Sequence, residues 1–111
     1  MKADIGSLLF IEDKHDNNKK RPHICIHVFT NKAGVPYNWL ILPITSNNTV
    51  GENNLVEVIH RKLNSISFAK INNIKTIPWS DDIEVARMGF AKKYVAAIVE
   101  KINCCLTDTN N

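Results

Sequence analysis

Two apolar segments separated by a short polar turn restrict the possible folds of this chain more than any other feature. The first spans residues 21–29 and the second spans residues 38–46, and both are rich in β-branched and aromatic side chains. The turn between them contains Asn31, Gly34 and Pro36. Apolar runs of this length and composition predict two β-strands, and the turn predicts that they pair as a hairpin with a long loop.

Polar side chains mark the ends of this predicted hairpin. Arg21 opens the first strand, and Thr45 and Ser46 close the second. In an antiparallel pair the start of one strand lies beside the end of the next, so we expect Arg21 and Thr45 to meet at one edge of the sheet. A guanidinium beside a hydroxyl at such an edge predicts a phosphate-binding site.

The composition indicates one globular domain over residues 1–111. The chain is 44% hydrophobic and 23% charged, and its net charge of +3 permits a polyanionic partner without requiring one. No apolar run approaches the ~18 residues that cross a bilayer, and the N-terminus does not resemble a signal peptide. Three cysteines, two of them adjacent, form neither a disulfide framework nor a zinc motif. We therefore expect a cytoplasmic protein with no metal or other cofactor and no membrane partner.

The remaining sequence predicts shorter strands and one long helix, which makes the fold mainly β. The further strands are expected at residues 6–11, 55–59, 65–71 and 72–78, and exposed loops at residues 14–20 and 47–54. Ser80 is predicted to cap a short helix over residues 83–87. From Ala91 onward, apolar residues recur at spacings of three and four, which predicts an amphipathic C-terminal helix, with a disordered tail at residues 107–111.

The order of these signals over residues 6 to 103 resembles the MazF/PemK family of ribonuclease toxins. The resemblance is carried by a glycine-led first strand and by three short motifs, Arg21-Pro22, Pro43-Ile44-Thr45-Ser46 and Asn73-Ile74-Lys75-Thr76-Ile77. The last motif stands where the family has Gln-Ile-Arg-Thr-Ile or a close variant. The chain departs from the family at Ser7, where many members carry an acid, and at Asn73 and Lys75, which replace glutamine and arginine.

The resemblance implies a fold, an activity and partners. It implies an SH3-like small antiparallel β-barrel with a C-terminal helix, acting as a homodimeric toxin of a toxin-antitoxin system. Such a toxin cleaves single-stranded RNA without a metal and is neutralised by an antitoxin. The resemblance also implies that Arg21 and Thr45 take part in cleavage. Lys70 and Asn72 fall where some members have an arginine and an aspartate, and Asn72 lacks the carboxylate of a base.

RNA cleavage at its own 2′-hydroxyl needs a base, a cation and an acid, and three side chains suit these roles. Arg21 keeps its charge and donates two hydrogen bonds to phosphate oxygens. Lys70 is a candidate acid or second phosphate-binding cation. His23 is a candidate base because it lies on the same strand face as Arg21 and its ordinary pKa is near 6.5. Lys70 and His23 also have purely structural alternatives. Lys70 can be a solvated strand lysine, and His23 can be a surface or interface histidine.

The other candidates for contacts with RNA have basic, amide, hydroxyl or aromatic side chains. They are Ser46, Lys19, Lys20, His15, Asn72, Asn73, Lys75 and Trp79. Trp79 is predicted to be exposed and able to stack on a base, whereas Trp39 is predicted to lie in the core or a dimer interface. A charge run such as Lys19-Lys20 is usually a solvated loop, so that alternative stays open.

Two other functions are compatible with the same fold. The first is a protein-targeting poison like the CcdB toxin, which traps DNA gyrase through an aromatic-containing C-terminus. Residues 104–111 of this chain contain no aromatic side chain, which argues against it. The second is a non-catalytic RNA-binding domain, which Ser7 and Asn72 keep open.

Overall fold

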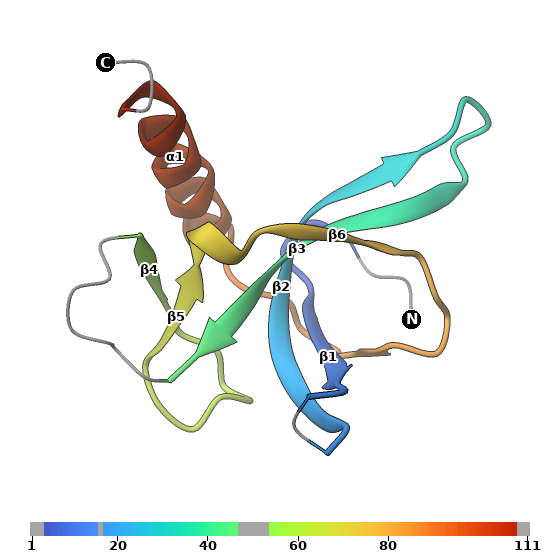
Figure 1. Cartoon of the computed structure of the whole chain (residues 1–111), viewed down its shortest axis with the longest axis horizontal. Coiled ribbons are helices and arrows are strands. Elements are labelled where there is room, and N and C mark those ends of the chain that lie inside the picture. The colour runs from blue at the N-terminus through green and yellow to red at the C-terminus, as the bar shows by residue number, and fades with distance from the viewer. Residues whose placement is uncertain (1–3, 16, 47–53, 109–111) are drawn as a thin grey trace.

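A computed structural model describes residues 4–15, 17–46 and 54–108, with the side chains of residues 105–108 excepted. The predictions for loop 47–53 and for residues 109–111 lie outside this part of the chain. In chain order the elements are β1 (Leu8–Asp13), β2 (Lys19–Thr30), β3 (Pro36–Thr45), β4 (Leu55–Val58), β5 (Ser67–Lys70), the 3-10 helix η1 (Ile71–Asn73), β6 (Lys75–Pro78), β7 (Glu84–Val85) and α1 (Lys92–Asp108) (Figure 1). The predicted class, mainly β with a C-terminal helix, is confirmed.

The predicted hairpin is the centre of the structure. Strands β2 and β3 pair antiparallel from His23 opposite Pro43 to Thr30 opposite Pro36. At the turn, the side-chain oxygen of Asn31 accepts hydrogen bonds from the backbone N–H groups of Ala33 and Val35. Gly34 has a φ of +80°, which L-residues rarely adopt, so glycine suits this turn. Figure 1 shows the turn end of the hairpin projecting away from the rest of the sheet.

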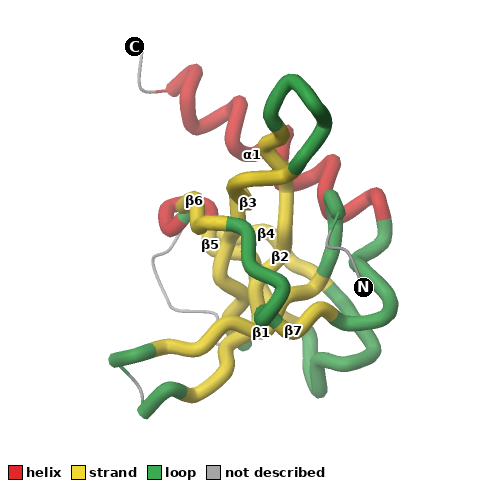
Figure 2. The backbone as a smooth tube through the Cα atoms, turned by 90° about the vertical axis from the view of Figure 1, so that its right-hand side faces the viewer, coloured by secondary structure: helices red, strands yellow, loops and turns green. Residues whose placement is uncertain are grey.

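The sheet is open, which corrects the expectation of a barrel. Its hydrogen-bonded order is β4-β5-β3-β2-β1-β7, and β6 also pairs with β3. Along one edge of β3, residues 38–41 pair with β6, whereas Ile44 and Thr45 pair with β5. The change of partner along β3 divides the sheet into two wings: β4 and β5 form one, and β1, β2, β6 and β7 form the other. No described strand joins β4 to β7. Both views place the connection between β1 and β2 at the opposite end of the molecule from α1 (Figures 1 and 2).

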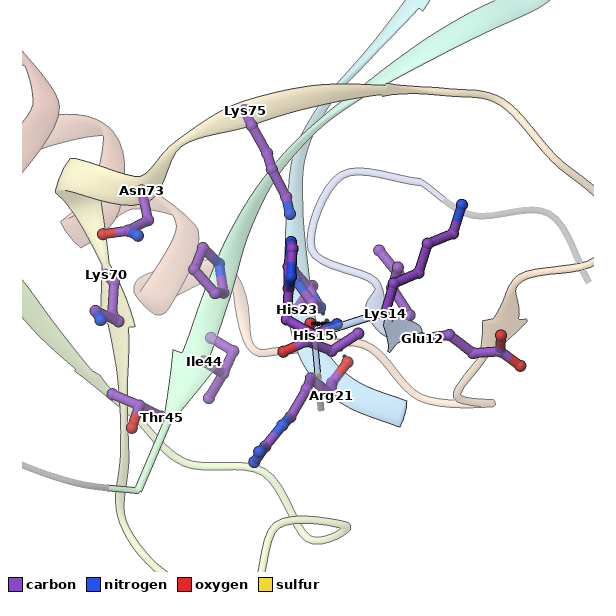
Figure 3. Close-up of a pocket in the computed structure, with 13 residues that line it drawn as sticks. Glu12, Lys14, His15, Arg21, His23, Ile44, Thr45, Lys70, Asn73 and Lys75 are labelled. Carbon is purple, nitrogen blue, oxygen red and sulfur yellow. Dashed lines mark hydrogen bonds between the residues drawn. The ribbon is translucent and has the colours of Figure 1, made fainter. Parts of the chain in front are cut away.

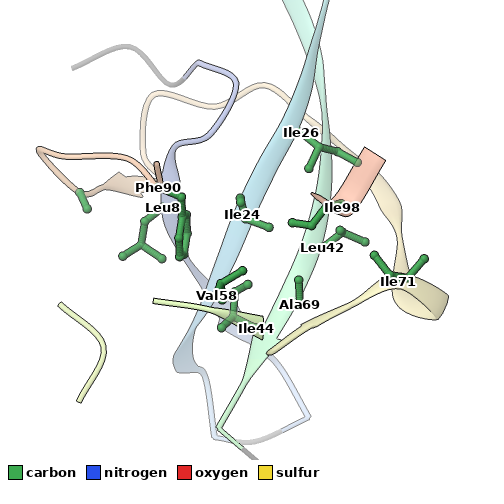
Figure 4. Close-up of a cluster of buried hydrophobic side chains, with 11 residues drawn as sticks. Leu8, Ile24, Ile26, Leu42, Ile44, Val58, Ala69, Ile71, Phe90 and Ile98 are labelled. Atoms are coloured by element: carbon green, nitrogen blue, oxygen red, sulfur yellow. The ribbon is translucent and has the colours of Figure 1, made fainter. Parts of the chain in front are cut away.

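The three central strands bury side chains on both faces, and adjacent residues alternate between two core clusters. The larger cluster includes Leu8, Ile24, Leu42 and Ile44, and it receives Ile98 from α1 (Figure 4). The smaller cluster consists of Leu9, Cys25, Trp39 and Ile41, against which half-buried residues from β6 and β7 pack. Strand β3 is therefore buried on both faces over the residues from Trp39 to Ile44.

The segment between β6 and α1 differs from its prediction. The helix expected over residues 83–87 is wrong, because Glu84 and Val85 form β7 and pair with Phe10 and Leu9. Ser80 does not cap a helix; its hydroxyl accepts a hydrogen bond from the backbone N–H of Asp82 at 3.2 Å within a local turn. Glu84 and Val85 therefore form a strand because they pair with the edge of β1. Two residues are too few for the sequence to show the alternation that would predict a strand.

The boundaries of three elements also shift. Strand β1 continues through Glu12 and Asp13, and β2 begins at Lys19, so the expected loop 14–20 is shorter than predicted. Asp13 lies opposite Lys19, and such a cross-strand pair of opposite charges favours the longer ladder. Helix α1 reaches Asp108, which extends it into the predicted tail. No helix in the described part of the chain has the length and apolar character needed to cross a membrane.

Candidate functional site

A pocket of about 540 Å³ opens where β3 changes its pairing partner. Pro43, which has no backbone N–H to donate, lies at this break between the residues that pair with β6 and those that pair with β5. We call this cavity the main pocket (Figure 3). It is lined by Ile11, Glu12, Asp13, Lys14, His15, Arg21, His23, Pro43, Ile44, Thr45, Lys70, Asn73 and Lys75.

Arg21 and Thr45 lie at the same end of the β2–β3 ladder, as the antiparallel geometry predicts. The ladder ends with His23 opposite Pro43, and each of the two residues lies two positions beyond that last pair. Both residues line the pocket, and Figure 3 shows their side chains on the same lower side of it. Arg21 is exposed and Thr45 is half-buried, so the guanidinium meets solvent while the hydroxyl is held close to the sheet.

His23 lines the same pocket, but the residue is only 5% exposed. Its Nδ1 lies 2.9 Å from the carbonyl oxygen of Arg21. Because a carbonyl only accepts hydrogen bonds, Nδ1 carries the proton, and Nε2 of the neutral ring is the nitrogen that can take one up. Burial is the main cause that lowers the pKa of His23 below 6.5, and the positive charge of Lys75 lowers it further. The Arg21 carbonyl and Asp13 act in the opposite direction.

The lowered pKa of His23 predicts a loss of stability in mildly acidic solution. The unfolded chain binds a proton at this histidine near pH 6.5, whereas the folded protein binds it only at a lower pH. Between these two pH values the unfolded state holds more protons, so the free energy of unfolding decreases as the pH falls. Urea unfolding at a series of pH values measures this decrease. In His23→Gln the decrease in the free energy of unfolding should be smaller than in wild type. An equal decrease in His23→Gln and wild type would contradict the burial of this ring.

Three further candidates reach the main pocket from the β5–η1–β6 segment. Lys70 ends β5, Asn73 lies in η1 and Lys75 begins β6, so the chain passes along the pocket rim as it moves from one wing of the sheet to the other. Figure 3 shows Lys75 extending from β6 toward His23, in agreement with its effect on the pKa of that ring. Loop residue His15 also lines the pocket, and its backbone N–H donates to the carboxylate of Asp13 at 2.9 Å.

The other predicted residues lie elsewhere. Lys20 forms an ion pair with Glu84 at 3.0 Å, away from the main pocket. The side chain of Asn72 accepts a hydrogen bond from that of Asn54 at 3.0 Å. Trp79 is half-buried rather than exposed, because its ring packs on that of Trp39 with 4.6 Å between the centroids. The prediction that Trp79 is exposed is therefore wrong. Trp39 lies in the core, which is one of the two positions predicted for it.

Lys19 and Ser46 line a neighbouring cavity that also includes Arg21 and Thr45. They therefore lie beside the predicted catalytic pair, although neither lines the main pocket.

The sequence reasoning missed two carboxylates at the main pocket, those of Glu12 and Asp13. Asp13 follows Leu9 and Ile11 at spacings of two, so extending the alternation of β1 by one step would have placed it on this face. Four lysine and arginine side chains and two carboxylates line the pocket, which favours an anionic ligand. Among the described residues, no group of three or more His, Cys, Asp or Glu side chains is placed to hold a metal ion.

No model of a known protein family matches the chain, and no curated protein matches its sequence. The function is therefore inferred from the pocket and from the motif order of the sequence.

Proposed function

We propose that this chain is a metal-independent endoribonuclease of the MazF/PemK type. In this proposal it is the toxin of a toxin-antitoxin system, cleaves single-stranded RNA, forms a homodimer and is neutralised by an antitoxin. The observation that supports the activity best is that Arg21, His23, Thr45 and Lys70, four residues from three strands, line one pocket. A cation, a base and an acid are the groups that this phosphodiester cleavage uses, and Arg21, His23 and Lys70 are side chains of these types.

The proposed reaction is attack of an RNA 2′-hydroxyl on the adjacent phosphate. Nε2 of His23 takes the 2′-hydroxyl proton as the bond from 2′-oxygen to phosphorus forms. Arg21 and the Thr45 hydroxyl donate hydrogen bonds to the phosphate oxygens, where negative charge grows. The bond from phosphorus to the 5′-oxygen then breaks, and Lys70 gives that oxygen a proton. The products are a 2′,3′-cyclic phosphate and a 5′-hydroxyl end. The imidazolium then returns its proton to solvent, and Lys70 takes up a proton from solvent.

The test is incubation of the purified protein with a long single-stranded RNA in the presence of EDTA. Discrete fragments with 5′-hydroxyl ends would support the proposal. Intact RNA in the presence of folded, antitoxin-free protein would overturn it. A gel-shift measurement on the same samples then separates two outcomes: retarded but intact RNA indicates a non-catalytic RNA-binding domain, and absence of binding favours a protein-targeting toxin.

A further inference from the structure

A second cavity of about 430 Å³ adjoins the main pocket. The two cavities share Arg21, Ile44 and Thr45, so the proposed catalytic pair lies between them. We call the second one the Lys62 cavity. Its outer wall is the turn between β4 and β5, which contributes Lys62, Leu63, Asn64 and Ser65. A ligand held at Arg21 and Thr45 therefore has room to extend on either side of that pair.

The lining of the Lys62 cavity combines positive charge with an apolar floor. Its charged residues are Lys19, Arg21 and Lys62, and no carboxylate is among the described residues that line it. The aromatic ring of Phe10 and the side chains of Pro22 and Leu63 supply apolar surface, and Asn64 supplies an amide that both donates and accepts hydrogen bonds. Cations suit the phosphates of a nucleotide, an apolar surface suits the face of its base, and an amide suits the edge of that base.

The turn that carries Lys62 and Asn64 is held in place by a buried histidine. His60 is 7% exposed, and its Nε2 donates a hydrogen bond to the carbonyl oxygen of Met88 at 2.7 Å. Its Nδ1 accepts one from the backbone N–H of Lys62 at 3.0 Å, and its ring packs edge-on against Phe90. The turn is therefore fixed before a ligand arrives, which lowers the entropy lost on binding.

We propose that the Lys62 cavity binds the stretch of single-stranded RNA next to the cleaved phosphodiester. Lys62 contacts a backbone phosphate, the base of the neighbouring nucleotide lies on the apolar floor, and Asn64 contacts the edge of that base. This subsite rests on the proposed function, because it takes Arg21 and Thr45 as the position of the cleaved phosphate. In this subsite Asn64 determines which base is preferred, whereas Lys62 increases the affinity for RNA of any sequence.

Binding of a fluorescent random-sequence oligonucleotide with 2′-O-methyl riboses tests the phosphate contact, because this probe has no nucleophilic 2′-hydroxyl. Anisotropy is measured over a range of salt concentrations for wild type, Lys62→Ala and the matched control Lys32→Ala. Lys32 is exposed in the turn at the end of the β2–β3 hairpin and lines neither cavity. We expect Lys62→Ala to weaken binding about threefold to tenfold and to reduce the salt slope by about 0.7, the loss expected for one phosphate contact. Equal affinities and slopes in Lys62→Ala and Lys32→Ala would overturn the contact.

Base preference is tested with Asn64→Ala and four homopolymeric probes of the same chemistry. The variant should narrow the differences in affinity between the four bases, whereas Lys62→Ala should weaken all four alike. If Asn64→Ala ranks the four probes as wild type does, with the same ratios between their affinities, the proposed contact of Asn64 with the base is overturned.

Cleavage of an unmodified RNA, measured alongside, keeps this inference distinct from the proposed function. If Lys62→Ala and Asn64→Ala cleave RNA as wild type does, the subsite is overturned and the proposed nuclease activity stands. Binding that depends on Lys62 without cleavage would support RNA binding in the Lys62 cavity and overturn the nuclease. Neither binding nor cleavage by wild type would overturn both.

Discussion

Arg21→Ala is expected to lower the rate of RNA cleavage by about two to three orders of magnitude, equivalent to ~2.7–4 kcal/mol of transition-state stabilisation. The reason is that Arg21 lies where the main pocket meets the Lys62 cavity and is the proposed donor to the phosphate as its charge grows. The guanidinium is exposed, so its removal should leave the free energy of unfolding nearly unchanged. Initial rates with one RNA substrate in EDTA give the measurement, and urea unfolding of the same samples verifies the fold.

The matched control for this substitution is Arg87→Ala. Arg87 is also exposed, but it lines neither cavity, so its loss removes the same charge away from the site. Arg21→Lys is informative as well, because lysine keeps the charge and loses the planar pair of donors, and most of the activity should still be lost. Equal rates for Arg21→Ala and Arg87→Ala would show that the phosphate is held elsewhere.

Trp39→Ala is expected to lower the free energy of unfolding by about 3–5 kcal/mol, the largest effect on stability that we predict. Trp39 is 1% exposed and is the largest member of the smaller core cluster, where its ring packs on that of Trp79. Its removal opens a cavity beneath β6 and β7, which the few residues of this cluster cannot refill. Denaturant unfolding monitored by far-ultraviolet circular dichroism measures the change.

Tyr37→Ala is the comparison for this effect. Tyr37 lies two residues earlier in the same strand and is 52% exposed, so its truncation should cost about 1 kcal/mol or less. Trp39→Phe adds a second test. Phenylalanine restores most of the apolar volume and removes the indole N–H, which has no hydrogen-bond partner among the described residues. Similar losses for Trp39→Ala and Tyr37→Ala would contradict the packing of the smaller cluster.

The parts of the structure that sequence predicts well are those with a long repeat of one pattern. The hairpin follows from two apolar runs around a turn built on Asn31 and Gly34, and α1 follows from its apolar spacing. The placement of Arg21 and Thr45 at the same end of the hairpin follows from antiparallel geometry, because the start of one strand lies beside the end of the next. Local patterns therefore locate the centre of the candidate site.

The parts that sequence does not predict depend on contacts between distant segments. Strand β7 exists because residues 84 and 85 lie beside β1, more than seventy positions earlier in the chain. Trp79 is half-buried because Trp39 offers a ring to pack on, which no pattern around residue 79 reveals. Asp13 lies outside the strand predicted over residues 6–11, yet β1 continues through it, and Asp13 lines the main pocket. The openness of the sheet likewise depends on how β3 divides its edge between β5 and β6.

The change of partner along β3 has a consequence for how such a protein can evolve. The pocket that opens there is lined by Arg21, Thr45 and Lys70, none of which belongs to either core cluster. Substitutions at these positions should therefore lower the free energy of unfolding only slightly, compared with the total of about 5–15 kcal/mol that is typical of a folded domain. Selection can alter the rim one residue at a time and change what the protein binds while the same scaffold continues to fold.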